Sequence, residues 1–327
     1  MLLSIRCILM TKKLKILPLT ISILILVVLI VYSNPEKFFR LIAGSNFVFI
    51  GIAFVISNIN LLIRVLKWYV LLDNVSFFSL APVQFFGMTA SNLSPGKIAE
   101  PLKSVVLKAY RGIPVSLSLP SVVWERTLEV VVLLILSAAG MLFFLKITDK
   151  IFWISAASFL VFGFLIVFVL LFLYNTAFRH FMFRIFRKFP VMNRITKHFI
   201  SNFERSKIKK RRMVYSFTAS LAAWLIDGLV IYFSLLAVGV QINPLALTCI
   251  FAVSTIIGII TFLPGGLGST DAVMIFFLTT LNIDYTVAVA GVLISRFLSI
   301  WYTNLLGGAS LIYLVKKTGL NFKNIYN

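Results

Sequence analysis

Apolar runs of about 20 residues recur along this chain, and they constrain its fold more than any other feature. They cover residues 16–32, 46–66, 121–145, 151–174, 213–240 and 285–314. A helix suits such a run in a bilayer because it satisfies its own backbone hydrogen bonds. Only 13% of the 327 residues are charged, about half the share usual in soluble proteins. The sequence therefore predicts an all-α polytopic membrane protein with about six full transmembrane helices, in which residues 1–327 form a single integral membrane domain.

The chain is strongly basic, with 31 Lys and Arg against 10 Asp and Glu. In so apolar a chain, cationic loops retained on the cytoplasmic side explain this excess better than nucleic-acid binding does. Basic residues precede the first apolar run, and Ser33-Asn34-Pro35 after it is no cleavage site of the signal-peptide type. We therefore expect an uncleaved first helix, a location in the cytoplasmic (inner) membrane, and both termini in the cytoplasm. Either Met1 or Met10 could start translation.

The loop at residues 175–212 carries 12 Lys or Arg and a single acid, Glu204. Apolar side chains recur there every three or four residues, which is typical of an amphipathic helix. We expect this helix to lie in the headgroup layer of an anionic leaflet, with membrane lipids as its partners. The alternative is a solvated loop that only sets the topology.

A basic and aromatic cluster closes the second apolar run. Arg64, Lys67, Trp68 and Tyr69 follow one another within six residues. Residues of these types gather at membrane–water interfaces. The sequence therefore predicts an interface anchor at this position.

Two segments break the apolar pattern with Pro and Gly. One lies within residues 77–112 and reads SPGKIAE at 94–100, and the other reads FLPGGLGSTDAVM at 262–274. Each places a carboxylate, Glu100 or Asp271, at the expected start of a helix after the break. Proline and glycine both interrupt helices, so we predict two re-entrant hairpins entering from opposite faces. Paired interrupted segments of opposite sense are typical of inverted-repeat transporters with a midplane site.

These motifs also have a plainer interpretation. Both hairpins could be packing elements or capped kinks, with the acids serving as caps. In that case Asp271 would itself accept hydrogen bonds from the helix amides that an anionic ligand would otherwise use. The sequence leaves these two interpretations open.

Several charged residues fall in or beside the apolar segments. They are Glu100, Glu125, Arg126, Glu129, Asp227, Asp271 and Arg296. A charge at the centre of a bilayer costs about 2.5–3.5 kcal/mol or more, so we expect these side chains to face the protein interior. We expect Arg126 or Arg296 to pair with one carboxylate, leaving another free for a cationic headgroup or a proton. The alternative is an ion network with only a structural role.

Signatures of catalysis and of cofactor binding are missing from the sequence. It contains no GxxxxGK[ST] loop, no GxSxG and no HExxH, and these motifs mark common nucleotide, hydrolase and zinc sites. Cys7 and Cys249 lie far apart, and His180 and His198 are its two histidines. We therefore predict no cofactor and no metal, and we favour a protein without catalysis of its own.

Four stretches resemble the lysylphosphatidylglycerol synthase transmembrane-region family of flippase-like membrane proteins. They are NLSPGKIAE at 92–100 with Lys103, ERTLE at 125–129, LPGGLGSTD at 263–271, and SRF at 295–297 leading to Gly307. The chain departs from the family pattern at three positions, with Ala99 for the usual Gly, Lys103 for Arg and Asp271 for Glu. A lysine lacks the bidentate grip of an arginine on phosphate or carboxylate.

The resemblance implies translocation of a lipid or lipid-linked headgroup between leaflets, without the lysyl transfer carried out by a fused soluble domain in some members. Alternatives are the membrane subunit of a split lipid-modifying system, with a separate envelope-biosynthesis enzyme as its partner, and a non-transporting envelope scaffold. The predicted substrate path and gates comprise Pro95, Gly96, Glu100, Lys103, Glu125, Arg126, Glu129, Pro264, Gly265, Gly266, Gly268, Asp271 and Arg296.

Overall fold

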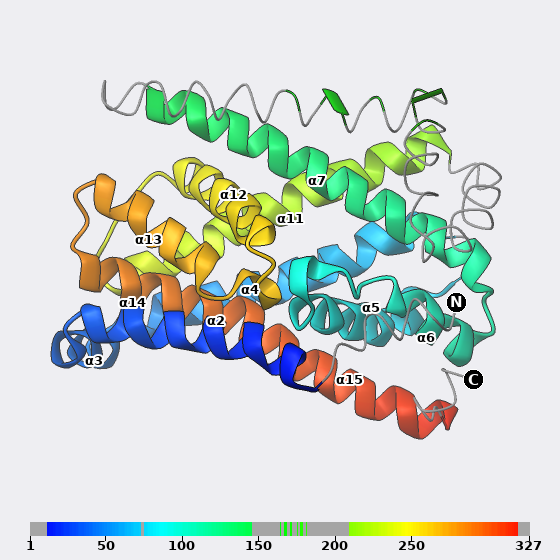
Figure 1. Ribbon diagram of the computed structural model, residues 1–327, viewed down its shortest axis with the longest axis horizontal. Helices are drawn as coiled ribbons and strands as arrows, with labels where there is room; N and C mark the ends of the chain where they lie inside the picture. The colour runs from blue at the N-terminus through cyan, green and yellow to red at the C-terminus, as the bar shows by residue number, and fades with distance from the viewer. Residues whose placement is uncertain are drawn as a thin grey trace.

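The computed structural model describes residues 12–72, 75–145 and 209–319, together with scattered residues between 164 and 181. Helices dominate this part of the chain, and it contains no strand (Figure 1). The all-α membrane fold predicted from the sequence is therefore confirmed. The predicted span 151–174 and the basic loop 175–212 lie almost entirely outside the described residues.

The long helices occupy the predicted positions. They are α2 (Lys12–Tyr32), α4 (Phe47–Tyr69), α7 (Val115–Leu145), α11 (Lys210–Ala237) and the continuous pair α14 (Tyr285–Arg296) and α15 (Tyr302–Thr318). Within the described residues, α4, α11 and the stretch Tyr285–Thr318 are long and apolar enough to cross a membrane. A fourth span results if α2 is counted with the short helix after it.

Two helical details were not predicted. Helix α3 (Pro35–Ala43) follows α2 at an angle of 91°, with Pro35 in its first turn and Asn34 accepting a hydrogen bond from the Lys37 amide at 3.3 Å. A π-helical turn, Phe297–Trp301, separates α14 from α15. Such turns inside α-helices often occur at functional sites, and this one follows Arg296 directly.

Both Pro-Gly segments are hairpins of two half-helices around a single 3-10 turn. The first is α5 (Phe77–Asn92), η1 (Pro95–Lys97) and α6 (Leu102–Arg111), and the second is α12 (Pro244–Ile260), η3 (Pro264–Gly266) and α13 (Ser269–Thr280). Ser94 and Leu263, the residues before the prolines, are extended, as steric contact with the proline ring demands. Gly96 and Gly265 have φ of 58° and 61°, where a Cβ atom would be strained. The predicted breaks are confirmed.

The order of elements occurs twice in the chain. A long helix, a half-helix, a 3-10 turn, a half-helix and a further helix follow one another from α4 to α7 and again from α11 to α14. Helices α4 and α11 pack against each other, and the two hairpins extend toward opposite ends of the molecule (Figure 1). This order agrees with the inverted repeat suggested by the sequence.

The hairpin tips meet in the interior. A Cβ atom added to Gly96 would lie 3.1 Å from the Phe262 ring, and one added to Gly265 would lie 3.0 Å from the Asn92 carbonyl oxygen. The two hairpins, although they extend toward opposite ends of the molecule, therefore contact each other at their tips, and the charged residues lie beside the tips. Only small residues at the turns permit this close approach.

Candidate functional site

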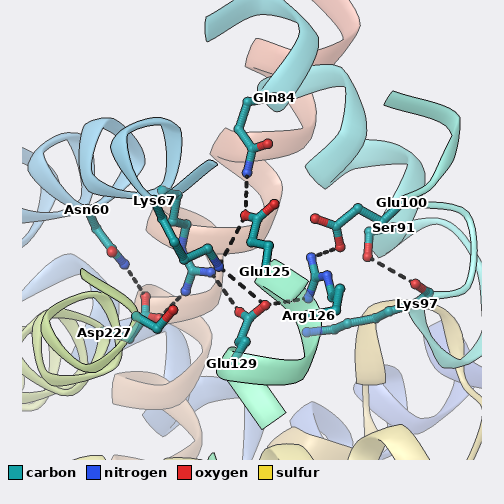
Figure 2. A network of polar contacts seen from close by, with 12 residues as sticks. Asn60, Lys67, Gln84, Ser91, Lys97, Glu100, Glu125, Arg126, Glu129 and Asp227 are labelled. Atoms are coloured by element: carbon teal, nitrogen blue, oxygen red, sulfur yellow. Dashed lines mark hydrogen bonds and ion pairs between the residues drawn. The ribbon is translucent and has the colours of Figure 1, made fainter. Parts of the chain in front are cut away.

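Charged side chains from α4, α7, α11 and the first hairpin converge next to the hairpin tips (Figure 2). Glu125 lies at the centre of one cluster and is fully buried. Its carboxylate is 2.5 Å from the Lys103 ammonium and 3.3 Å from that of Lys67, and it accepts a hydrogen bond of 3.3 Å from Gln84. Lys103 also lies 4.3 Å above the Trp68 ring. Helices α4, α5, α6 and α7 are thus joined through a single carboxylate.

Glu129, one turn further along α7, links this cluster to the centre of the molecule. It is 3.2 Å from Arg64, 3.4 Å from Lys67 and 2.7 Å from Arg126. Asp227 of α11 completes the chain of contacts. Its carboxylate lies 2.5 Å from Arg64 and accepts a hydrogen bond of 2.6 Å from the Asn60 amide.

The two hairpin carboxylates each pair with an arginine from the helix after the hairpin. Glu100 contacts Arg126 of α7, and Asp271 contacts Arg296 of α14. Asp271 also accepts a hydrogen bond of 2.9 Å from the Gly268 amide at the start of α13. The carboxylate is fully buried, so it caps the half-helix and neutralises a buried guanidinium at once.

A polar cavity of about 90 Å³ opens at the junction of the hairpin tips with α4, α7, α11 and the π-turn. That volume holds several water molecules. Its charged lining comprises four cationic side chains and two carboxylates: Arg64, Lys97, Arg126, Arg296, Glu129 and Asp227. Because both carboxylates already contact arginines, the free space is next to excess positive charge.

Four of the predicted path residues line this cavity: Arg126, Glu129, Gly265 and Arg296. The others are not part of the cavity lining. They form buried ion pairs or belong to the turns of the hairpins: Pro95, Gly96, Glu100, Lys103, Glu125, Pro264, Gly266, Gly268 and Asp271. The expectation that buried charges find partners is confirmed. The expectation of a free carboxylate is wrong, because Glu100, Glu125, Glu129, Asp227 and Asp271 all contact a cation.

The predicted interface anchor on α4 is also wrong in part. Lys67 and Trp68 are 2% and 0% exposed, and Arg64 lines the cavity. Basic and aromatic residues at the end of an apolar run give the same sequence pattern whether they contact lipid headgroups or buried carboxylates. Asn60, Lys97 and Trp224 were likewise not among the predicted site residues, although Lys97 stands inside the SPGKIAE motif. Among the described residues, no group of three His, Cys, Asp or Glu could hold a metal ion.

Sequence comparison extends the likeness beyond the motifs. Residues 16–307 match the family described as the lysylphosphatidylglycerol synthase TM region. A UPF0104 membrane protein of Methanothermobacter thermautotrophicus is 24% identical over 318 residues, which cover 90% of this chain and 93% of the relative. One from Pyrococcus horikoshii is 26% identical, covering 88% of this chain and 93% of the relative.

A phosphatidylglycerol lysyltransferase of Staphylococcus xylosus is 37% identical over 84 residues, covering 26% of this chain and 10% of that enzyme. The match to the family covers nearly all the residues that the structure describes, including both hairpins and every charged residue of the cavity. The protein therefore is a multi-pass membrane protein that belongs to the lysylphosphatidylglycerol synthase TM region family.

Proposed function

We propose that this protein moves an amphipathic lipid, either a phospholipid or a lipid-linked headgroup, between the leaflets of the cytoplasmic membrane. The observation that carries the proposal is the charged cavity at the junction of two opposed re-entrant hairpins, inside an otherwise apolar helical bundle. A charged cavity in such a bundle is costly unless it serves a polar substrate. Interrupted helices at a repeat interface are where membrane transporters bind their substrates.

In this mechanism the headgroup enters the cavity while the acyl chains stay in the bilayer. Arg64, Lys97, Arg126 and Arg296 offer it hydrogen-bond donors, and the two contacting hairpin tips, with Lys97 and Gly265, form part of the cavity wall. Movement of one hairpin against the other would expose the cavity to one leaflet at a time. Both chain termini and the basic loop 175–212 would face the cytoplasm, with the loop on the anionic leaflet.

Leaflet exchange in proteoliposomes tests this function. Vesicles carry a trace of acyl-labelled fluorescent phospholipid, and dithionite bleaches the label on the outer leaflet. With the protein present, we expect bleaching to proceed beyond the outer half within minutes, because inner lipids reach the outer leaflet. Protection of half the label, as in vesicles without protein, would contradict the proposal.

A second candidate is the membrane subunit of a split lipid-modifying system. The match to 84 residues of a phosphatidylglycerol lysyltransferase favours it. It predicts that deleting the gene changes the lipid composition of the cell, whereas leaflet exchange predicts unchanged composition with altered leaflet distribution. Lipid mass spectrometry of a deletion strain, with surface labelling of aminolipids, distinguishes them.

A scaffold role is excluded if reversing the charges across residues 205–212 leaves function intact.

A further inference from the structure

We propose that the cavity binds the phosphate of a net-anionic headgroup and disfavours a net-cationic one. This inference rests on the proposed function and specifies the class of lipid that is moved. Two observations on the described part of the chain carry it: every buried carboxylate there is paired, and several buried donors on side chains that line the cavity are unpaired.

The carboxylates leave no acceptor for a cationic group. Glu129 contacts Arg64, Lys67 and Arg126, and Asp227 contacts Arg64 and Asn60. An ammonium entering the cavity would therefore have to displace an arginine or a lysine from a buried carboxylate. Such an exchange gains little, because a buried charge without its partner is strongly unfavourable.

Lys97 differs from the three arginines of the cavity lining in its pairing. It stands at the tip of the first hairpin and lines the cavity, and its side chain points toward Arg126 and Glu129 (Figure 2). Among the described residues it forms no ion pair. Its backbone has φ of 59°, a conformation that costs energy for any residue except glycine. Backbone strain of this kind persists where the surrounding structure fixes it, often at a functional position.

Further donors on the cavity wall have no hydrogen-bond partner among the described residues. They are the buried atoms Arg126 Nε, Arg296 Nη2 and Trp224 Nε1, which only donate. The Thr255 hydroxyl, which can donate or accept, and Asn60 Oδ1, which only accepts, are also unsatisfied. Arg296 and Trp224 are only 5% and 3% exposed. Buried polar groups are rarely left without partners, so this excess of donors indicates a bound group that only accepts hydrogen bonds.

A phosphodiester fits these donors. Its two unesterified oxygens accept hydrogen bonds and share one negative charge, and guanidinium donors bind phosphate strongly. Two contacts fix the position of the Arg296 guanidinium. Its Nε donates a hydrogen bond to the Asp271 carboxylate, and its Cζ atom lies 5.2 Å from the centre of the Phe251 ring. Its Nη2 atom is buried and has no hydrogen-bond partner among the described residues. The site is therefore preorganised for an anion before the headgroup arrives.

A comparison of the exchange rates of three lipids with different headgroups tests this proposal in proteoliposomes. Phosphatidylcholine vesicles containing the protein receive trace acyl-labelled phosphatidylglycerol, phosphatidylcholine or lysylphosphatidylglycerol, and each exchange rate is measured by dithionite bleaching. We expect the anionic lipid to exchange about tenfold faster than the cationic one. Equal rates, or a faster cationic lipid, overturn the inference while the proposed function stands. Exchange of none of the three rejects the proposed function and this inference with it.

Two variants test whether the cavity causes the preference for the anionic lipid. Lys97→Gln should slow phosphatidylglycerol exchange about tenfold, because it removes the positive charge that attracts the phosphate, and Trp224→Phe about threefold, because it removes the indole N–H donor. Lys316→Gln is the matched control, since Lys316 is exposed at the end of α15, and it should exchange at the wild-type rate. Wild-type rates in both cavity variants overturn the inference. Entry of radiolabelled inorganic phosphate into the vesicles, without lipid preference, would assign the site to free phosphate and also overturn it.

Discussion

Replacing Glu125 with glutamine is expected to lower the free energy of unfolding by about 3–5 kcal/mol. Glu125 is fully buried and neutralises Lys67 and Lys103 together. Glutamine keeps the shape but leaves both ammonium groups with one carboxylate fewer, in a place where water cannot replace it. Denaturation in mixed detergent micelles measures the effect.

Matched variants isolate this effect. Glu36→Gln removes a carboxylate that is 74% exposed and paired with Arg40, and it should change stability by less than about 1 kcal/mol. Adding Lys103→Gln to Glu125→Gln removes one of the two ammonium groups that Glu125 would otherwise neutralise. The double variant should therefore regain part of the lost stability. A Glu125→Gln protein as stable as wild type would show that the carboxylate does not hold the four helices together.

Replacing Asp271 with asparagine is expected to cost a similar 3–5 kcal/mol and to stop leaflet exchange. Asparagine can still accept the Gly268 hydrogen bond that caps α13, but it leaves the Arg296 guanidinium buried without a counter-charge. Asp284→Asn is the control. That carboxylate is half exposed, lies 2.8 Å from Lys37 and caps α14, and asparagine caps a helix equally well.

A second substitution separates folding from transport at this pair. Arg296→Met in the Asp271→Asn background removes the stranded charge, and the double variant should recover most of the lost stability. It should still fail to exchange anionic lipids, because the cavity has lost the Nη2 donor of Arg296. Exchange at the wild-type rate in the folded double variant would show that Arg296 does not contact the headgroup.

The hairpins could be predicted from the sequence because their cause is local. Pro95 and Pro264 force the preceding residue to be extended, and the glycines after them adopt angles that other residues avoid. The charged site could be predicted in part for a similar reason. Arg126, Glu129 and Arg296 interrupt apolar runs, and a charge at membrane depth must face the interior.

The rest depended on which helices meet, and no local pattern contains that information. Arg64 and Lys67 have the spacing of an interface anchor, and only the packing of α4 against α7 and α11 brings them to Glu125, Glu129 and Asp227. Direct contact between the hairpin tips was missed for the same reason. Lys97 follows Pro-Gly in a turn, and its sequence position alone does not show that its side chain lines a cavity.

If the headgroup passes through the cavity beside the hairpin tips, a side chain that fills the cavity should stop leaflet exchange. The most direct test fills this space with Ser299→Trp, since Ser299 lines the cavity from the π-turn. The control is Leu305→Trp, which adds the same ring at a position 68% exposed on α15. In proteoliposomes, with folding checked by thermal unfolding, we predict that Ser299→Trp abolishes leaflet exchange and Leu305→Trp retains it. Wild-type exchange by folded Ser299→Trp would contradict the claim.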